Sequence, residues 1–298
     1  MPNMQGEVDV WINEIQGWII GLSGLLFLSC TSCQYKDLSP AYIHLEQFEV
    51  VSPNGQKLRH NIKELWLFID DQYAGTFNVP SQIPVLEPGR HRIAFFPGIR
   101  DYGISTYPEI YTLMNDFGTD LELNAGTTMT IAPAFSYKSN LINYIQEGFE
   151  SSSVFVSDLD SFKTHTIIRS SQNARDGSYS GLGFIDSGHP VIETASADIP
   201  MTSSAKKSAY IELDLLSDNA LQIGLISGQN QDLFKIYFLT LNPSQSWKKI
   251  YIPIYQIIQN NAELSRAGAL RLVLKSELKA PANTGYFFID NVRLMCLP

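Results

Sequence analysis

Alternation of apolar and acidic residues is clearest in the segment Tyr210-Ile-Glu-Leu-Asp-Leu215. Successive side chains of a β-strand point to opposite faces, so the apolar residues that alternate here share one face and Glu212 and Asp214 share the other. The segment Leu270-Arg-Leu-Val-Leu-Lys275 repeats the pattern. Both segments therefore predict strands with one buried face, and we interpret the face of Glu212 and Asp214 as solvated.

Short runs of this kind fill most of the chain from His44 onward. Gly, Pro, Asn and Asp interrupt them about every ten positions, a spacing typical of all-β domains. Only the stretch from Pro253 to Leu264 has the apolar spacing expected of a short helix. A length of 298 residues suggests two domains at roughly 150 residues each. We therefore predict an all-β protein with two β-sandwich domains, over residues 44–140 and 146–298.

The first of these domains contains a predicted hairpin. Its strands are Leu65–Ile69 and Tyr73–Val79, joined by a turn at Asp70-Asp71-Gln72. Pro80 and Pro84 cannot donate to a strand ladder, so the segment after the hairpin is predicted to be an edge strand or a crossing loop.

The run from Trp66 to Phe96 resembles a PEGA-type domain, a small β-sandwich common in surface proteins. That family has a strand, an Asp-rich turn, Gly, Pro and then Leu-x-x-Gly-x-His before the next strand. The matching positions here are Asp70, Asp71, Gly75, Pro80, Leu86, Gly89 and His91. The resemblance implies an Ig-like structural module outside the cytoplasm, without catalysis.

The second domain resembles a galactose-binding-type jelly roll, the fold of many carbohydrate-binding modules. The resembling segments, in that family's order, are Gly148-Phe149-Glu150, Arg175-Asp-Gly-Ser-Tyr-Ser180, Trp247-Lys-Lys-Ile-Tyr-Ile-Pro253 and Tyr286-Phe-Phe-Ile-Asp-Asn-Val-Arg-Leu294. The resemblance implies a possible structural Ca²⁺ held by oxygen ligands where the first and last strands meet, with Glu150 and Asp290 in the matching positions. The alternative is that Glu150 accepts backbone hydrogen bonds and that Asp290-Asn291 shapes a β-bulge.

An uncharged, mostly apolar run from Trp18 to Leu28 is followed by Cys30 and Cys33. It is shorter than the ~20 residues that span a bilayer and fits the core of a secretory signal, which has about 7–15 residues. A cysteine directly after Leu-Ser or Thr-Ser resembles the lipobox of bacterial lipoproteins. That resemblance implies cleavage before a cysteine whose thiol carries diacylglycerol.

We favour Cys33 as the lipid-attachment residue, with Cys30 as the alternative. Residues 1–32 are then a signal peptide and residues 33–43 a tether. Residues 1–32 contain three acids and no Lys or Arg, whereas a signal peptide begins with basic residues. The alternative is a buried N-terminal helix of a cytosolic protein.

The chain carries a net charge of −9, and its longest basic clusters are Lys206-Lys207 and Lys248-Lys249. We interpret these pairs as solvated strand edges, and they do not form a basic surface that would bind a nucleic acid. Three cysteines cannot form a disulfide framework. With Cys33 lipidated, Cys296 is expected to be a small buried residue of the last strand. With Cys30 as the anchor, a bridge between Cys33 and Cys296 remains open.

A tyrosine-rich connection from Pro97 to Asp120 contains Tyr102, Tyr107 and Tyr111. Because tyrosine combines a stacking face with a polar tip, these three residues are candidate ligand-binding residues. Trp247 is a further candidate, as a platform for a sugar ring. The alternative is that the tyrosines cover the end of the sandwich and that Trp247 belongs to the core.

The sequence lacks a recognisable catalytic motif. Glu212-Leu-Asp214 misses the second glutamate of a laminarinase-like strand, and retaining cleavage of a glycoside needs two carboxyls only ~5 Å apart. We therefore predict a non-enzymatic, lipid-anchored protein of the outer membrane or cell surface of a Gram-negative bacterium, which binds a glycan or another surface polymer. The alternative is a structural or accessory subunit of an outer-membrane protein complex.

Overall fold

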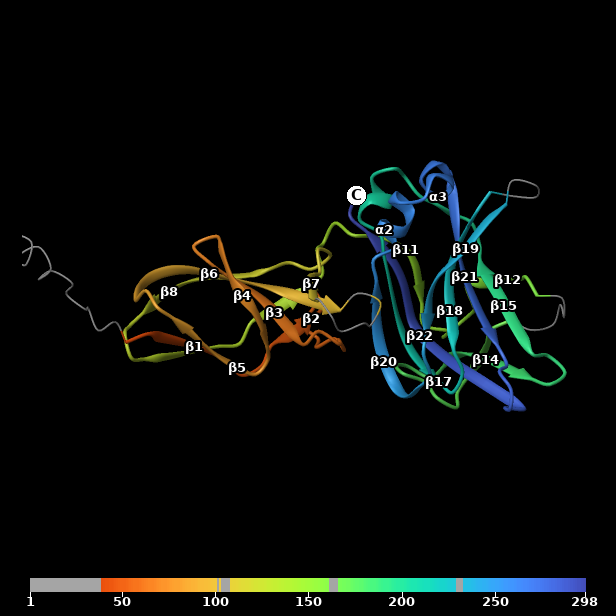
Figure 1. The fold of residues 1–298 in the computed structure, drawn as a ribbon, viewed down its shortest axis with the longest axis horizontal. Coiled ribbons are helices and arrows are strands. Elements are labelled where there is room, and N and C mark those ends of the chain that lie inside the picture. Colours follow the sequence, from red (N-terminus) through yellow and green to blue (C-terminus); the bar gives the residue numbers. More distant parts are fainter. Residues whose placement is uncertain (1–38, 101, 103–107, 161–165, 229–232) are drawn as a thin grey trace, which may run out of the picture.

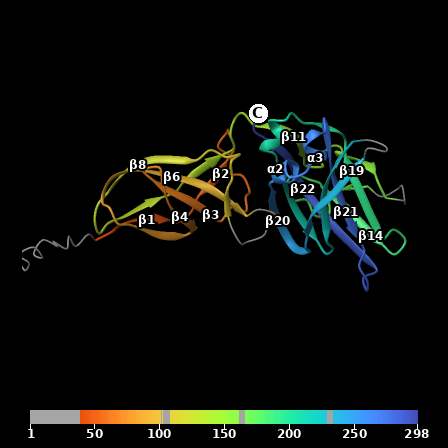
Figure 2. The same ribbon diagram turned by 45° about the horizontal axis from the view of Figure 1, so that its top comes forward.

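The computed structural model describes residues 39–298 except 101, 103–107, 161–165 and 229–232. Two β-sandwiches lie end to end along its long axis, and Figures 1 and 2 show β20 as the strand of the second sandwich that lies beside the first. The prediction of an all-β protein with two sandwiches is confirmed. The predicted signal peptide, Cys30, Cys33 and Tyr107 lie outside the described residues.

The first sandwich is built from short strands that follow one another closely. They are β1 (Ala41–Leu45), β2 (Glu49–Val51), β3 (Glu64–Ile69), β4 (Gln72–Asn78), β5 (Ser81–Val85), β6 (Gly89–Arg100), β7 (Pro108–Ile110), β8 (Phe117–Leu123), β9 (Thr128–Ile131) and β10 (Ala134–Ser136). One sheet has the order β5-β1-β9, and a second has the order β4-β3-β6-β7 with β8 also paired to β6. Strands β2 and β10 form a separate parallel pair. Buried side chains such as Leu65, Phe95 and Phe135 form the core of this sandwich.

The predicted hairpin is present as β3 and β4. Asp70 and Asp71 at its tip have φ values of 50° and 62°, and a two-residue type I′ turn requires positive φ at both positions. The Asp70 carboxylate accepts a hydrogen bond from the Arg92 amide (2.9 Å) and lies 2.6 Å from His91 Nδ1. The turn is therefore tied to β6, and the hydrogen bond that His91 donates to the Asp70 carboxylate raises the pKa of the His91 imidazole.

Two boundaries of the first sandwich can be compared with the sequence. Strand β5 lies at the end of its sheet, as Pro80 and Pro84 predict. Strand β1 begins at Ala41, ahead of the predicted start of the domain at His44. The difference arises because Ala41 and Ile43 are core residues, 1% and 0% exposed, inside a stretch that looks like a polar tether in the sequence.

The second sandwich has longer strands and, within its described residues, three short helices. The elements are β11 (Ile142–Glu147), β12 (Phe155–Asp158), β13 (Ile168–Ser170), β14 (Ser180–Asp186), β15 (Val191–Ser196), β16 (Ile199–Pro200), η2 (Ala205–Lys207), β17 (Tyr210–Ser217), β18 (Leu221–Ser227), β19 (Phe234–Leu241), β20 (Ser244–Ile252), α2 (Ile254–Gln259), α3 (Ala262–Arg266), β21 (Ala269–Glu277) and β22 (Thr284–Cys296). One sheet has the order β13-β14-β22-β17-β20, with β11 also paired to β22, and we call it the near sheet because it contacts the first sandwich. The far sheet has the order β12-β15-β21-β18-β19, with β16 also paired to β21.

The core of the second sandwich lies between these two sheets. Leu213 and Leu215 of β17 face Leu272 and Leu274 of β21 in one cluster, and all four are at most 1% exposed. Cys296 is fully buried at the end of β22, as the sequence predicts with Cys33 lipidated. Among the described residues, no helix has both the length and the apolar character that crossing a membrane requires.

The predicted short helix is present as two helices, α2 and α3. They are separated because the side chain of Asn261 accepts hydrogen bonds from the amides of Glu263 and Leu264, which makes it the N-cap of α3.

Candidate functional site

The face of the near sheet that lies opposite its core is covered by the first sandwich. Tyr210, Tyr251 and Met295 project from β17, β20 and β22 into the hydrophobic cluster of the first sandwich, and each is 2% exposed. The ring of Tyr111 lies 5.2 Å from the rings of both Tyr210 and Tyr251, in the edge-on geometry that aromatic pairs prefer. The apolar core of the first sandwich therefore continues onto the second.

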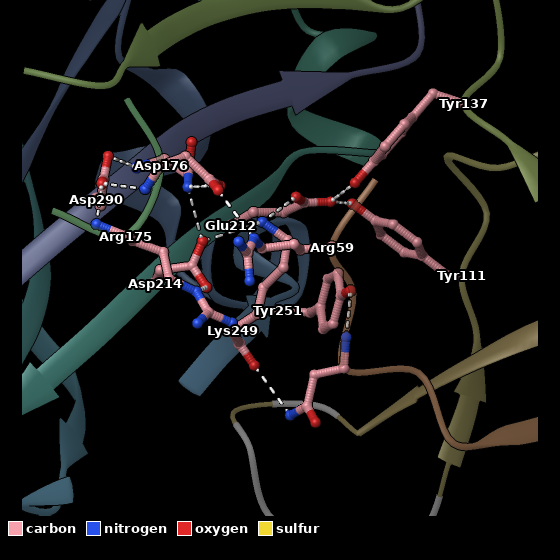
Figure 3. A network of polar contacts seen from close by, with 12 residues as sticks. Arg59, Tyr111, Tyr137, Arg175, Asp176, Glu212, Asp214, Lys249, Tyr251 and Asp290 are labelled. Carbon is pink, nitrogen blue, oxygen red and sulfur yellow. Dashed lines mark hydrogen bonds and ion pairs between the residues drawn. The ribbon is translucent and has the colours of Figure 1, made fainter. Parts of the chain in front are cut away.

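Glu212 lies fully buried within this interface (Figure 3). Its Oε1 accepts hydrogen bonds from the hydroxyls of Tyr111 (2.5 Å) and Tyr137 (2.7 Å), and its Oε2 lies 3.0 Å from Lys249 Nζ. Burial alone would raise the pKa of Glu212, but the Lys249 charge, the two hydroxyls and the Arg293 charge together lower it. Burial and the Glu212 charge raise the pKa values of Tyr111 and Tyr137, so both hydroxyls remain donors.

The prediction of a solvated acidic face on β17 is wrong. Glu212 is 0% exposed and Asp214 is 1% exposed. Alternation in a strand reports which side chains share a face, and it does not report what covers that face. Here the cover is a separate sandwich.

Asp214 extends the polar network away from Glu212 (Figure 3). Its Oδ2 accepts a hydrogen bond from Asn291 Nδ2 (3.1 Å) and lies 3.9 Å from Lys249 Nζ. Asn291 Nδ2 also donates to Asp176 (2.9 Å), whose other oxygen accepts from Arg59 Nε (2.9 Å). Because Arg59 precedes β3, this chain of contacts is a second polar link between the two sandwiches.

Glu150 and Asp290, the predicted Ca²⁺ positions, both hold one loop of the second sandwich. Glu150 Oε1 accepts hydrogen bonds from the amides of residues 178 and 179 (2.8 and 3.0 Å). Asp290 Oδ2 accepts from the amides of residues 175 and 176 (3.0 and 3.2 Å). Burial raises the pKa of Asp290 to about 6, backbone donors partly offset that effect, and the neighbouring Asp214 charge adds to it.

These contacts agree with the alternative in which Glu150 accepts backbone hydrogen bonds and Asp290-Asn291 shapes a β-bulge. The pairing of β17 with β22 shifts register opposite Asp290, and Asn291 has a φ of 50°, so a bulge is present there. In the part of the chain that the structure describes, no group of three His, Cys, Asp or Glu side chains is arranged to hold a metal ion. Because a carboxylate has about four lone-pair sites, these hydrogen bonds leave room for a metal ligand, and Ca²⁺ at Glu150 and Asp290 stays a prediction.

A cleft of about 430 Å³ opens between the sandwiches, beside this network. Its volume is within the ~300–1,000 Å³ typical of small-ligand sites. Residues of β19, of β20 and of the turn between them form one wall, which includes Leu239, Asn242 and Lys248. The first sandwich contributes Asn61, Lys63, Arg100 and Tyr102.

Direct contacts hold the two walls of the cleft together. Asn61 Nδ2 donates to the Lys249 carbonyl (3.1 Å), and the Asn61 amide donates to the Tyr251 hydroxyl (3.3 Å). The Tyr102 amide donates to the Tyr251 carbonyl (3.0 Å), and the Tyr102 hydroxyl donates to Gln256 Oε1 (3.3 Å). These contacts fix how the two walls of the cleft lie relative to one another.

The candidate ligand-binding residues have different positions. Tyr102 lines the cleft. Tyr111 is 0% exposed, so it offers no face to a ligand, and its prediction as a ligand-binding residue is corrected to a role in packing and hydrogen bonding. Trp247 is half-buried on β20 beside Lys248 and is not one of the described residues that line the cleft. Tyr107 lies outside the described residues.

Several residues of the site carried no signal in the sequence. Asn61 and Lys63 belong to no motif, and their role depends on contact with β20, far along the chain. The sequence shows Lys248-Lys249 as a basic pair and predicts that both lysines are solvated at a strand edge. Lys248 is exposed as expected, but Lys249 is buried by the interface.

Comparison with known proteins gives likenesses of fold. No family model matches the chain, and no curated protein matches it. A module named TmCBM61, solved in complex with β-1,4-galactotriose, is 17% identical, with a TM-score of 0.33 over 51% of this chain and 97% of that chain. A family 30 carbohydrate-binding module of a cellulosomal cellulase of Clostridium thermocellum is 11% identical, with a TM-score of 0.36 over 52% and 96%. A xylan-binding domain from CBM 22 is 16% identical, with a TM-score of 0.35 over 52% and 94%.

The structural neighbours are thus carbohydrate-binding modules, the class that the second half resembles in sequence. At identities of 11–17% and TM-scores of 0.33–0.36, we transfer no ligand and no residue role from them. The PEGA-like module and the lipoprotein signal stay predictions.

Proposed function

We propose that this protein is a non-enzymatic lipoprotein of the bacterial envelope that binds a glycan or another surface polymer in the cleft between its sandwiches. The observation that carries the proposal is the cleft of about 430 Å³, which direct contacts between the two sandwiches hold open. It combines the ring of Tyr102 with polar and apolar side chains. A sugar presents both hydroxyls and apolar ring faces, so this mixture suits it.

The position of the acidic residues of β17 supports binding rather than hydrolysis. Retaining cleavage needs an acid and a nucleophile about 5 Å apart at the sugar. Glu212 is fully buried and held by Tyr111, Tyr137 and Lys249, and Asp214 is 1% exposed. Neither carboxylate reaches a ligand in the cleft.

The proposed attachment to a membrane depends on the N-terminal sequence. In the proposal, Cys33, or else Cys30, carries the lipid that holds the protein at the outer membrane or cell surface of a Gram-negative bacterium. One acyl chain binds a membrane only marginally, so stable anchoring needs more than one. The intact mass of the membrane-extracted protein tests this: we expect a chain that begins at Cys33 and carries acyl groups. A chain that retains Trp18 and carries no lipid would contradict it.

Glycan binding is tested on an array with the purified full chain and two tyrosine variants. Tyr102→Ala removes the ring that lines the cleft, and Tyr73→Ala removes a tyrosine of β4 that is 54% exposed and does not line it. We expect retention of a glycan by the wild type and Tyr73→Ala, and loss of retention by Tyr102→Ala. A wild type that retains no glycan, or a Tyr102→Ala variant that binds as well as the wild type, would refute the proposal.

A second candidate function is an accessory subunit that binds another envelope protein. It is favoured by an apolar hollow of about 220 Å³ on the second sandwich, lined by Tyr144, Val154, Val156 and Ile199 among others. Val156 is 63% exposed, and contiguous exposed apolar surface often marks a protein contact. A cross-link in intact cells that Val156→Asp abolishes, together with an empty glycan array, would favour this function over the first.

A further inference from the structure

We infer that the cleft selects acidic glycans, whose sugars carry carboxylate or sulfate groups. This inference rests on the proposed glycan-binding function and adds the charge of the ligand to it. The chain as a whole is acidic, with 30 Asp and Glu against 21 Lys and Arg. The cleft is an exception to that balance.

Every charged side chain among the described residues that line the cleft is a cation. These side chains are Lys63, Arg100, Lys248 and Lys249. Lys63 and Arg100 come from the first sandwich, and Lys248 and Lys249 from β20. An anionic ligand between the two walls would therefore meet positive charge on both sides.

Two of these cations are already paired with acids that are buried. Arg100 Nε donates to Glu64 Oε1 (2.8 Å), and Lys249 Nζ lies 3.0 Å from Glu212 Oε2. Glu64 is 5% exposed and Glu212 is 0% exposed, so neither carboxylate lies on the cleft surface.

The other two cations are the ones available to a ligand. Lys63 and Lys248 are exposed, and neither forms an ion pair with a residue that the structure describes. They also lie close in the fold, because Asn61 donates from its side chain to the carbonyl of Lys249. Lys63 thus follows Asn61 closely in the first sandwich, and Lys248 directly precedes Lys249 in β20.

The remaining features of the cleft favour a sugar polymer over a nucleic acid. A chain of net charge −9 lacks the extended basic surface that binds a nucleic-acid backbone, and the cleft offers a ligand only two exposed lysines among its described residues. Tyr102 supplies a ring for stacking, and Asn61 and Asn242 supply amide groups for hydroxyls. An acidic sugar can use the ring, the amide groups and the two exposed lysines together.

The test compares charged and neutral forms of the same polymers. Dextran sulfate is set against dextran, and polygalacturonate against its methyl ester, by titration calorimetry with the full chain. The variant is Lys63→Gln/Lys248→Gln. The matched control is Lys207→Gln/Lys279→Gln, which removes two exposed lysines outside the cleft.

We expect the cleft variant to bind the acidic polymers about 2- to 30-fold more weakly, because it loses two exposed charge pairs and each contributes about 0.2–1 kcal/mol. The control variant should bind like the wild type. The difference should vanish on raising salt from about 0.1 M to about 1 M, which shortens the screening length from about 10 Å to about 3 Å.

Three results would overturn the inference. Equal binding of acidic and neutral polymers, unchanged in Lys63→Gln/Lys248→Gln, would overturn it and leave the proposed glycan-binding function standing. Tighter binding of single-stranded DNA than of either acidic glycan would replace it with general polyanion binding. Failure of the wild type to bind either acidic polymer while it retains a glycan on the array would overturn the inference alone, whereas failure to retain any glycan on the array would overturn the inference and the proposed function together.

Discussion

Replacing Lys249 by methionine is expected to destabilise the fold strongly. Lys249 Nζ lies 3.0 Å from Glu212 Oε2, and the two side chains are 8% and 0% exposed. The variant would leave an ionised carboxylate in the interface with the hydroxyls of Tyr111 and Tyr137 as its hydrogen-bond donors and the Arg293 charge as its remaining cationic neighbour. Removing one partner of a buried ion pair costs about 3–5 kcal/mol of unfolding free energy.

A second substitution separates the ion pair from the packing of the lysine stem. In Glu212→Gln the amide oxygen can still accept from both tyrosine hydroxyls, and the charge is gone. We therefore expect Lys249→Met/Glu212→Gln to be more stable than Lys249→Met alone, with a coupling of about 2 kcal/mol or more.

Urea unfolding followed by tryptophan fluorescence measures these free energies. Lys57 and Glu49 form the matched reference pair, because they are 74% and 36% exposed. The cycle of Lys57→Met and Glu49→Gln should give a coupling below about 1 kcal/mol. The reasoning is refuted if Lys249→Met lies within about 0.5 kcal/mol of the wild type, or if the two interface substitutions are simply additive.

Two further predictions concern the second sandwich. Asp290 has a pKa of about 6 in the fold, so it keeps its proton to a higher pH than in the unfolded chain. The free energy of unfolding should therefore fall by up to about 3 kcal/mol through this group as pH rises from about 4 to 6. Urea titrations at several pH values should show this fall in the wild type and not in Asp290→Asn. Parallel pH profiles for the two proteins would contradict the prediction. In Gly183→Ala, the new Cβ would stand 2.1 Å from Cζ of the buried Phe287 ring, which should cost about 1–3 kcal/mol. Gly268→Ala meets no atom within 4 Å and should stay within about 0.5 kcal/mol of the wild type, so equal melting temperatures for these two variants would show the argument to be wrong.

The strands and turns were predictable because their causes are local. Alternation in β17 and β21 follows from the pleat of each strand, and the turn at Asp70-Asp71 follows from residues that tolerate positive φ. The edge position of β5 follows from Pro80 and Pro84, which lack the amide hydrogen that a second neighbour would need.

The site was predictable only in part because it depends on contacts between distant segments. Tyr102 and Tyr111 occupy the same tyrosine-rich connection, yet one lines the cleft and the other is buried against Glu212. Nothing within that connection distinguishes them, since the difference is set by where β17 and β20 lie. The burial of Glu212 has the same origin, and so does the role of Asn61.

The cleft and its proposed ligand both require that the two sandwiches behave as one body. Differential scanning calorimetry of the full chain tests this most directly. The buried network and the shared tyrosine cluster predict a single endotherm in which the van't Hoff enthalpy equals the calorimetric enthalpy. Two separate endotherms, or a calorimetric enthalpy about twice the van't Hoff value, would show that the sandwiches unfold independently and would contradict the account.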